Sequence, residues 1–246
     1  MMRRAIFMGL VFLGVPAVCW SQGLPTITLG IDEATSPQQV STALQVLFVL
    51  TVFSMAPAVL LMTTSFTRIV IVLSIVRQSM GTQQMPPNQV IIGLALFLTF
   101  FVMAPTYKEI NDTALQPYLT EQISQEQALE RAAGPLREFM LAQANEKDLS
   151  LLMDISKAEA PDNEDDIPLM TLVPAFMLSE LKRAFQMGFM IYVPFLVIDM
   201  VVASVLLSMG MMMLPPIIIS LPFKLLLFVL VDGWGLIVSS VIRSFY

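Results

Sequence analysis

Four long runs of apolar residues restrict the folds that this sequence can adopt. They cover residues 43–62, 90–107, 184–213 and 217–231 and contain very few charged side chains. A helix needs about 20 apolar residues to cross a bilayer, and runs of this length need lipid or other protein to cover them. Charged residues make up only 13% of the chain, about half the share in a water-soluble domain. We therefore expect an all-α, membrane-associated protein built from helical hairpins.

The N-terminus has the pattern of a secretory signal peptide. Two arginines precede the apolar run Ala5–Val18, and the small residues Cys19 and Ser21 fit a cleavage site after Ser21. We expect residues 1–21 to be removed, which would leave the new N-terminus outside the cytoplasm. An uncleaved anchor is the alternative, although the apolar run is short for a membrane span.

The apolar runs divide the rest of the chain into three parts. Residues 22–107 would form a polar cap and the first two spans. Residues 169–246 would form the last two spans with a methionine-rich loop between them. The part between, residues 108–168, is acidic: fourteen Asp or Glu stand against five Lys or Arg up to position 166.

This acidic part is predicted to be a small helical insert. Ser124 and Gln127 have the spacing of a capping box, which begins a helix. Gly134-Pro135 is expected to end that helix and start another. Basic residues favour the cytoplasmic side of a membrane, so Arg68 and Arg77 are interpreted as inward-side anchors, which places the insert in the periplasm.

Prolines interrupt the apolar runs. A proline inside a helix removes one backbone hydrogen bond and clashes with the preceding turn. We therefore expect helix breaks at Pro57, Pro105, Pro215 and Pro216. Such breaks are costly in lipid, so the spans are expected to face protein more than lipid.

Several chemistries are excluded by composition. The chain has no histidine and one cysteine, so neither an internal disulfide nor a zinc site of His and Cys ligands can form. The net charge of −6 and the lack of a basic patch argue against nucleic acid as a partner. Asp199 and Asp232 could suggest an intramembrane aspartyl protease, but the Gly-x-Gly-Asp signature of that class is absent. We expect no enzyme activity and no cofactor.

An ion- or proton-coupled transporter is the alternative. The octets Leu50–Pro57 and Leu98–Pro105 are identical at six of eight positions, and internal repeats are typical of secondary transporters. One short match is weak support for a duplication.

Several ordered blocks resemble the FliP family, whose members are core subunits of the flagellar type III export gate. The match runs from the signal peptide to the C-terminus, and its most diagnostic blocks are residues 62–105, 174–182, 208–216, 221–224 and 231–234. The resemblance implies a channel subunit through which unfolded flagellar proteins are exported.

The resemblance also implies the setting and the partners. Family members assemble in several copies, with a pentamer expected, together with FliQ and FliR. The other expected partners are the export-gate proteins FlhA and FlhB, flagellar rod proteins and the exported unfolded polypeptides. The expected location is the flagellar basal body at the bacterial inner membrane, facing the periplasm, with the assembly lifted largely above the membrane plane.

The methionine-rich loop is the first candidate site. Flexible thioether side chains can close a pore and still part for chains of different width. Ordinary apolar packing is the alternative, but the resemblance implies the constriction of the export channel. The candidate gasket residues are Met209, Met211, Met212 and Met213.

Ionisable side chains in or beside apolar runs form the second candidate site. Lys224 lies within a span and needs a partner. Asp232 is eight residues away, about 12 Å along a helix, which is too far for a direct pair. An adjacent helix or a neighbouring subunit must therefore supply the carboxylate. A solvated helix end remains an alternative for Glu180 and Asp232. We interpret four residues as pairing groups that set assembly register: Glu180, Asp199, Lys224 and Asp232.

Overall fold

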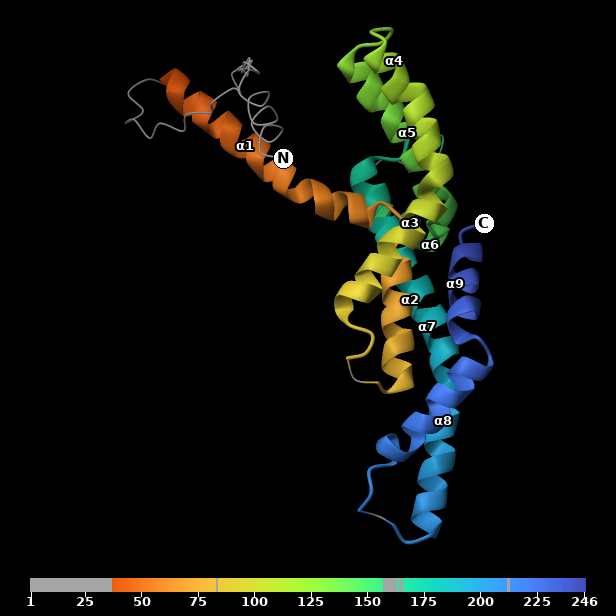
Figure 1. Ribbon diagram of the computed structural model, residues 1–246. Coiled ribbons are helices and arrows are strands. Elements are labelled where there is room, and N and C mark those ends of the chain that lie inside the picture. Colours follow the sequence, from red (N-terminus) through yellow and green to blue (C-terminus); the bar gives the residue numbers. More distant parts are fainter. Residues whose placement is uncertain (1–36, 83, 157–162, 164–165, 212) are drawn as a thin grey trace, which may run out of the picture. The chain divides into compact units, whose positions relative to one another are not determined.

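A computed structural model describes residues 37–82, 84–156, 163, 166–211 and 213–246 (Figure 1). The predicted signal peptide, residues 1–21, lies outside these ranges. All regular structure within them is helical, which confirms the predicted all-α class. The chain divides into two units, residues 1–50 and 51–246, and the fold described below is that of the second unit together with the local structure of α1.

The helices follow one another along the chain. Their bounds are α1 Pro37–Met62, α2 Phe66–Met80, α3 Asn88–Ile110, a π-helical turn Asn111–Leu115, α4 Gln116–Leu119, α5 Gln125–Gln143, α6 Glu146–Ser156, α7 Leu169–Ser208, α8 Pro216–Leu230 and α9 Gly233–Arg243.

Helix α2 lies at the centre of the main hydrophobic core. It packs against α3, α7 and α8, with its longest contact along α7. Ile69, Val72, Leu73 and Val76 recur at helical spacing and are completely buried. This helix has fewer apolar residues than the four runs, yet it is the best covered, because neighbouring helices surround it.

Helix α7 is the longest element. Its 40 residues correspond to about 60 Å, twice the hydrocarbon thickness of a bilayer. It begins at Leu169, well before the apolar run that starts at residue 184. Most of its buried residues lie before Gly188, where α2, α5 and α6 cover it, and the second half is largely exposed.

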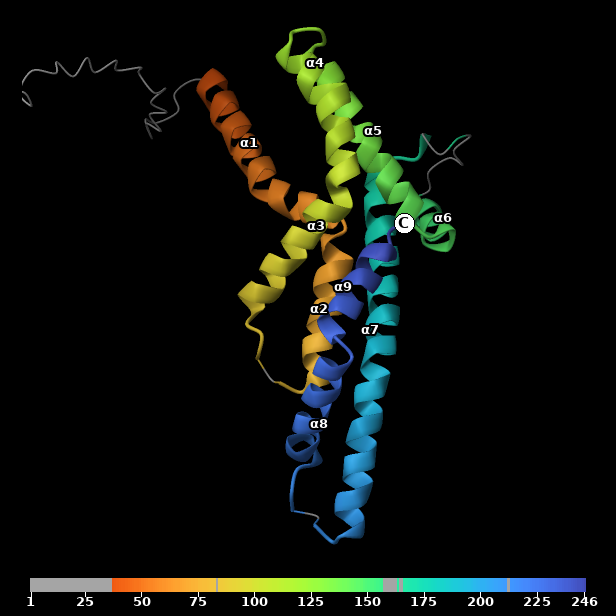
Figure 2. The same ribbon diagram turned by 45° about the vertical axis from the view of Figure 1, so that its right-hand side comes forward.

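Two of the expected helix breaks are wrong. Pro57 lies inside the continuous helix α1, and Pro105 lies inside α3. The loss of one hydrogen bond does not end a helix whose other bonds remain, although the axis of α3 changes direction along its length (Figure 2). Pro215 and Pro216 differ, because Pro215 caps α8 and Pro216 is its first residue.

The acidic insert is helical, and its first helix begins as expected. The backbone N–H of Gln127 donates to Ser124 Oγ over 3.3 Å, and that of Ser124 donates to Gln127 Oε1 over 3.2 Å. This confirms the capping box. The expected break at Gly134-Pro135 is wrong, because α5 runs on to Gln143 with Pro135 buried against its neighbours.

The boundary between residues 107 and 108 is not a break in secondary structure. Helix α3 continues through the π-helical turn into α4, so the second apolar run and the start of the insert share one helical rod. Among the described residues, three helical segments are long and apolar enough to cross a membrane: Leu44–Met62, Asn88–Leu119 and Leu169–Ser208. Together, α8 and α9 would make a fourth, bent by 64°.

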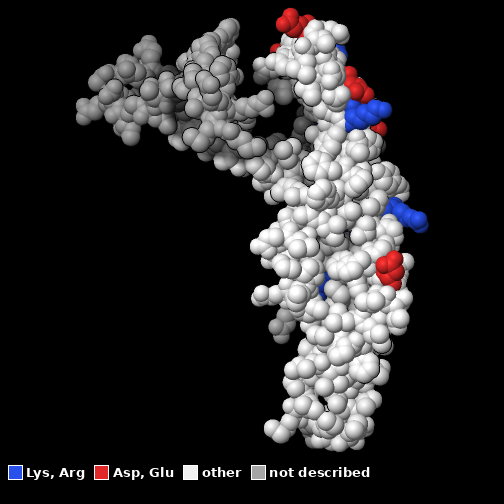
Figure 3. Space-filling model, in the orientation of Figure 1, with Lys and Arg blue, Asp and Glu red and all other residues white. Residues whose placement is uncertain are grey.

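Charged side chains are unevenly distributed over the surface. Figure 3 shows acidic and basic residues around the insert and on the side of α9, whereas the far end of the α7–α8 hairpin is free of them on this face. The sequence between Asp199 and Lys224 contains no charged residue, so the far end of the hairpin is an uncharged part of the surface.

Candidate functional site

The α7–α8 hairpin ends in the methionine-rich loop. Met209 is 66% exposed, Met211 39% and Met213 98%, and Met212 lies outside the described residues. These side chains are therefore surface residues of the isolated chain.

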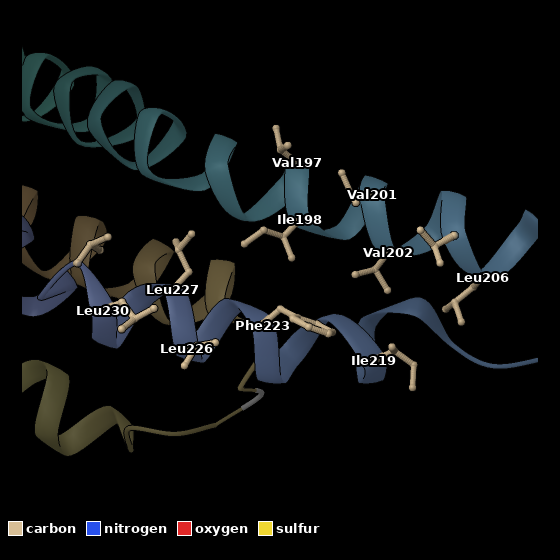
Figure 4. Close-up of a pocket in the computed structure, with 12 residues that line it drawn as sticks. Val197, Ile198, Val201, Val202, Leu206, Ile219, Phe223, Leu226, Leu227 and Leu230 are labelled. Carbon is tan, nitrogen blue, oxygen red and sulfur yellow. The ribbon is translucent and has the colours of Figure 1, made fainter.

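A groove of about 690 Å³ runs between the two arms of the hairpin. Figure 4 shows that both helices contribute to it, with Ile198 and Val202 of α7 facing Phe223 and Leu227 of α8. Every lining side chain is an aliphatic or aromatic hydrocarbon. Covering such a surface is favourable, by about 25 cal/mol per Å² of apolar area removed from water.

An ion pair between a buried lysine and a partly exposed aspartate joins the arms of the hairpin at its base. Lys224 Nζ on α8 lies 2.6 Å from Asp199 Oδ2 on α7. The other oxygen of that carboxylate accepts a hydrogen bond from Ser220. Lys224 also donates to the carbonyl oxygen of Ser79 over 3.1 Å, at the C-terminal end of α2, where a cation is favoured. An adjacent helix of the same chain thus supplies the carboxylate.

A second ion pair lies in the core between α2 and α7. The Arg68 guanidinium makes a bidentate contact with the carboxylate of Glu180, and both side chains are essentially inaccessible. Arg68 also donates to Gln143 Oε1 over 2.9 Å. Because a buried charge is tolerated only when it is paired and hydrogen-bonded, this geometry gives each charge its partner.

The residues after α9 close this cluster. Arg68 Nη1 donates to the carbonyl oxygen and the hydroxyl of Ser244, over 2.8 and 2.9 Å. Its guanidinium carbon lies 3.8 Å from the ring centroid of Phe245, a cation–π contact. Gln143 Nε2 donates to the carbonyl oxygen of Phe245 over 3.0 Å. The cluster therefore connects α2, α5 and α7 with the residues that follow α9.

A third ion pair attaches α6 to α7. The carboxylate of Asp148 is almost fully buried and pairs with the partly exposed Lys182. Ser179 donates to Asp148 Oδ2 over 2.9 Å and accepts from the backbone N–H of Asn145 over 2.8 Å. The hydrogen bond from Lys182 holds the pKa of Asp148 below its usual range, against the opposing effect of burial.

Three of the four expected pairing residues form ion pairs within this chain. Asp199 and Lys224 pair with each other, and Glu180 pairs with Arg68. Asp232 is exposed at the start of α9, with a left-handed φ of 49°, and has no ion pair among the described residues.

The interpretation of Arg68 as an inward-side anchor is wrong, since its side chain is inside the core. Arg77 is only half-buried and donates to the carbonyl oxygen of Pro86 over 3.2 Å, close to the start of α3. The apolar residues that follow Arg68 were a sign of burial, but its partner is 112 positions away. Nothing in the spacing of the sequence identifies that partner.

The three ion pairs hold helices of this chain together. Within the described part of the chain, no group of three or more Cys, Asp or Glu is placed to hold a metal ion. The charged residues join helices to one another, while the apolar side chains of the hairpin remain uncovered. The fold and site define a membrane-associated helical protein with surfaces suited to contact other proteins or lipid.

Comparison with known proteins gives the particular family. The chain matches the FliP family over residues 49–241. It is 60% identical over 217 residues to the flagellar biosynthetic protein FliP of Bacillus subtilis, covering 88% of this chain and 98% of that protein. It is 50% identical over 231 residues to FliP of Caulobacter vibrioides, covering 94% and 85%. It is 48% identical over 224 residues to FliP of Aquifex aeolicus, covering 90% and 92%.

The chain therefore belongs to the FliP family, as its sequence blocks predicted. The three relatives are named flagellar biosynthetic proteins. Nothing in these comparisons favours the transporter alternative.

Proposed function

We propose that this protein is a core subunit of the flagellar type III export gate and that its α7–α8 hairpin helps to form the channel for unfolded flagellar proteins. Family membership supports the flagellar role. The observation that carries the channel role is the far part of the hairpin: residues 200–223 contain no charged side chain, most of their large apolar side chains are exposed, and methionines are exposed at the tip.

The length of α7 supports a role inside an assembly. About 60 Å of helix exceeds the apolar thickness of one bilayer, and the half that is uncovered in this chain also borders the apolar groove. Copies of this chain, together with FliQ and FliR, would cover that surface and form a ring. FlhA, FlhB, the rod proteins and the exported polypeptides would then contact the assembled gate.

The methionine tip would seal the channel. Water and ions are excluded from a narrow apolar constriction, and flexible thioethers adapt to chains of different width. Met209, Met211, Met212 and Met213 would line this seal, while Lys224 and Asp199 would fix the angle between the arms of the hairpin. The surrounding membrane would be the bacterial inner membrane, with residues 108–168 on the periplasmic side after removal of residues 1–21.

The assembly is tested by native mass measurement of the detergent-extracted complex. We expect a hetero-oligomer containing several copies of this chain. A single chain that remains active alone would contradict the proposal and would favour a transporter.

The seal is tested by replacing Met211, Met212 and Met213 with alanine. This change shortens three apolar side chains, adds no charge and leaves Pro215 and Pro216 in place, so the complex should still assemble. We expect ion conductance across the membrane to rise, with export kept at least in part. If the triple variant assembles and conducts no more than the wild type, the methionines are packing residues only.

A further inference from the structure

A hydrogen-bonded turn at the end of α7 determines where the chain leaves the helix. Gly210 has a φ of +74°. Its backbone N–H donates to the carbonyl oxygen of Leu207 over 3.0 Å, and the N–H of Met211 donates to that of Leu206 over 3.0 Å. These two bonds around one left-handed residue form a Schellman motif, which satisfies two otherwise free carbonyls of the last helical turn.

The motif divides the methionines into two groups. Met209 still has helical backbone angles, and its N–H donates to the carbonyl oxygen of Val205 over 3.1 Å. The N–H of Met211 is held by the motif, and its side chain is 39% exposed. Met213 lies beyond the motif and is 98% exposed. Two methionines are thus attached to the end of α7, and a third projects from the hairpin.

The constraint at Gly210 is conformational rather than steric. A Cβ atom added there would meet no atom within 4 Å, so space is available for a side chain. The backbone angle, however, is one that β-branched residues avoid strongly and that asparagine tolerates. Glycine adopts it without a Cβ penalty.

Two prolines restrict the backbone where the chain enters α8. Pro215 caps α8, Pro216 is its first residue, and the N–H of Ile218 donates to the carbonyl oxygen of Pro215 over 3.1 Å. Since proline restricts φ at both positions, the loop enters α8 along a fixed path. The direction of its exit from α7 therefore depends on Gly210.

We infer that Gly210 is a positioning residue for the methionine tip: its left-handed conformation holds Met209 and Met211 at the end of α7 and leaves Met213 to project. This inference rests on the proposed function, because the arrangement affects a seal only if the hairpin lines the channel.

The arrangement itself can be tested without any channel. Cys19 is the one natural cysteine, so Cys19→Ser gives a background for single cysteines at positions 211 and 213. In the full chain in detergent, Met213→Cys should react with a maleimide severalfold faster than Met211→Cys. Adding Gly210→Val should raise the rate at position 211 towards that at 213, and Gly210→Asn should leave the ratio unchanged.

A matched control exists in α5. Gly134 is exposed, a Cβ there would also meet nothing within 4 Å, and its φ is not left-handed. Gly134→Val should therefore leave the ratio of labelling rates unchanged. Equal rates at 211 and 213 in the parent protein, or an unchanged ratio in Gly210→Val, would overturn the inference.

Conductance of the assembled complex separates this inference from the proposed function. Complexes that carry Gly210→Val should conduct ions as those with the triple alanine variant do. Complexes that carry Gly210→Asn should conduct no more than the wild type. If the triple variant leaks and Gly210→Val is tight, Gly210 has no positioning role but the methionine seal stands. If neither leaks, both ideas are wrong. Gly210→Ala, with less strain, replaces the valine variant if that one fails to assemble, and it should leak to a smaller degree.

Discussion

At the residue scale, Arg68 shows how a charge is kept inside an apolar core. Its guanidinium is surrounded by the carboxylate of Glu180, the amide oxygen of Gln143, the Ser244 carbonyl and hydroxyl, and the ring of Phe245. Arginine suits this position because its planar fork presents several donors at fixed angles. Lysine would carry the charge without matching that geometry.

Replacement of Arg68 by alanine is therefore expected to be severe. It leaves the Glu180 carboxylate buried without its cation, a loss of roughly 3–5 kcal/mol in the free energy of unfolding. Thermal unfolding of the detergent-solubilised protein measures this. Arg77→Ala is the control and should cost far less, because Arg77 is half-buried. The double variant Arg68→Met, Glu180→Met should be less destabilised than Arg68→Ala, and equal losses would contradict this account of the pair.

Asp148 gives a pH dependence with a definite sign. Its pKa is lowered in the folded protein by the hydrogen bond from Lys182. The stabilisation is therefore fully present above the unfolded value of about 3.9 and is lost as the pH falls through the lower folded value. The midpoint temperature of thermal unfolding should therefore decrease as the pH is lowered through that range. Asp148→Asn should have a lower midpoint at pH 6 and a smaller fall on acidification; an equal fall would assign the effect to other carboxylates.

At the element scale, the contact between α2 and α7 determines how closely the core can pack. Gly188 of α7 faces Ile75 of α2, and a Cβ atom at Gly188 would lie 2.2 Å from Ile75 Cδ1 and 3.1 Å from Cγ2. The absence of a side chain lets the two helices approach. Arg68–Glu180 and Lys224–Ser79 then connect α2 to α7 and to α8 respectively.

Gly188→Ala should accordingly destabilise the protein by overpacking, about 1–3 kcal/mol. Adding Ile75→Ala removes the overlapping atoms, so the double variant should lose less stability than the sum of the two single changes. Gly93→Ala in α3 is the matched control, because nothing lies within 4 Å of its added Cβ. Strictly additive losses at 75 and 188 would show that the close approach has no energetic consequence.

At the scale of the whole molecule, the exposed apolar surface is the dominant property. Large hydrophobic side chains remain exposed along the described part of α1, along the second half of α7 and along α8. Monomeric soluble proteins rarely leave contiguous patches of this kind uncovered. The ion pairs hold the helices of the chain together, and the uncovered surfaces are available for lipid and partner subunits.

Lys224 connects these two levels. Lys224→Ala leaves Asp199 without its ammonium and removes the hydrogen bond from the middle of α8 to the end of α2, so the hairpin loses its fixed angle. We expect co-purification of the partner subunits to be lost. The penalty should be smaller than the roughly 3–5 kcal/mol for breaking a fully buried pair, because the Asp199 side chain is 27% exposed. Lys147→Ala, which removes an exposed lysine of α6, should assemble normally. Normal assembly of the Lys224 variant would show that the pair is dispensable.

The sequence by itself determined the helical class, the apolar runs, the capping box at Ser124 and the family. These features follow from local periodicity, from composition and from ordered blocks of residues, all of which can be recognised along the chain. It also indicated that Lys224 needs a carboxylate, because an unpaired charge among apolar residues is costly wherever the chain folds.

Only the tertiary structure decided which carboxylate that is and where Arg68 lies. Glu180 is 112 positions from Arg68, and Asp199 is 25 positions from Lys224. Each pair joins two different helices, and such pairing leaves no periodic signal in the sequence. The continuity of α1, α3 and α5 through their prolines was decided in the same way, because the remaining hydrogen bonds and, in α3 and α5, the packing of neighbouring helices outweigh a local penalty. Local chemistry thus specifies the elements, and long-range contacts assign their charged residues to sites.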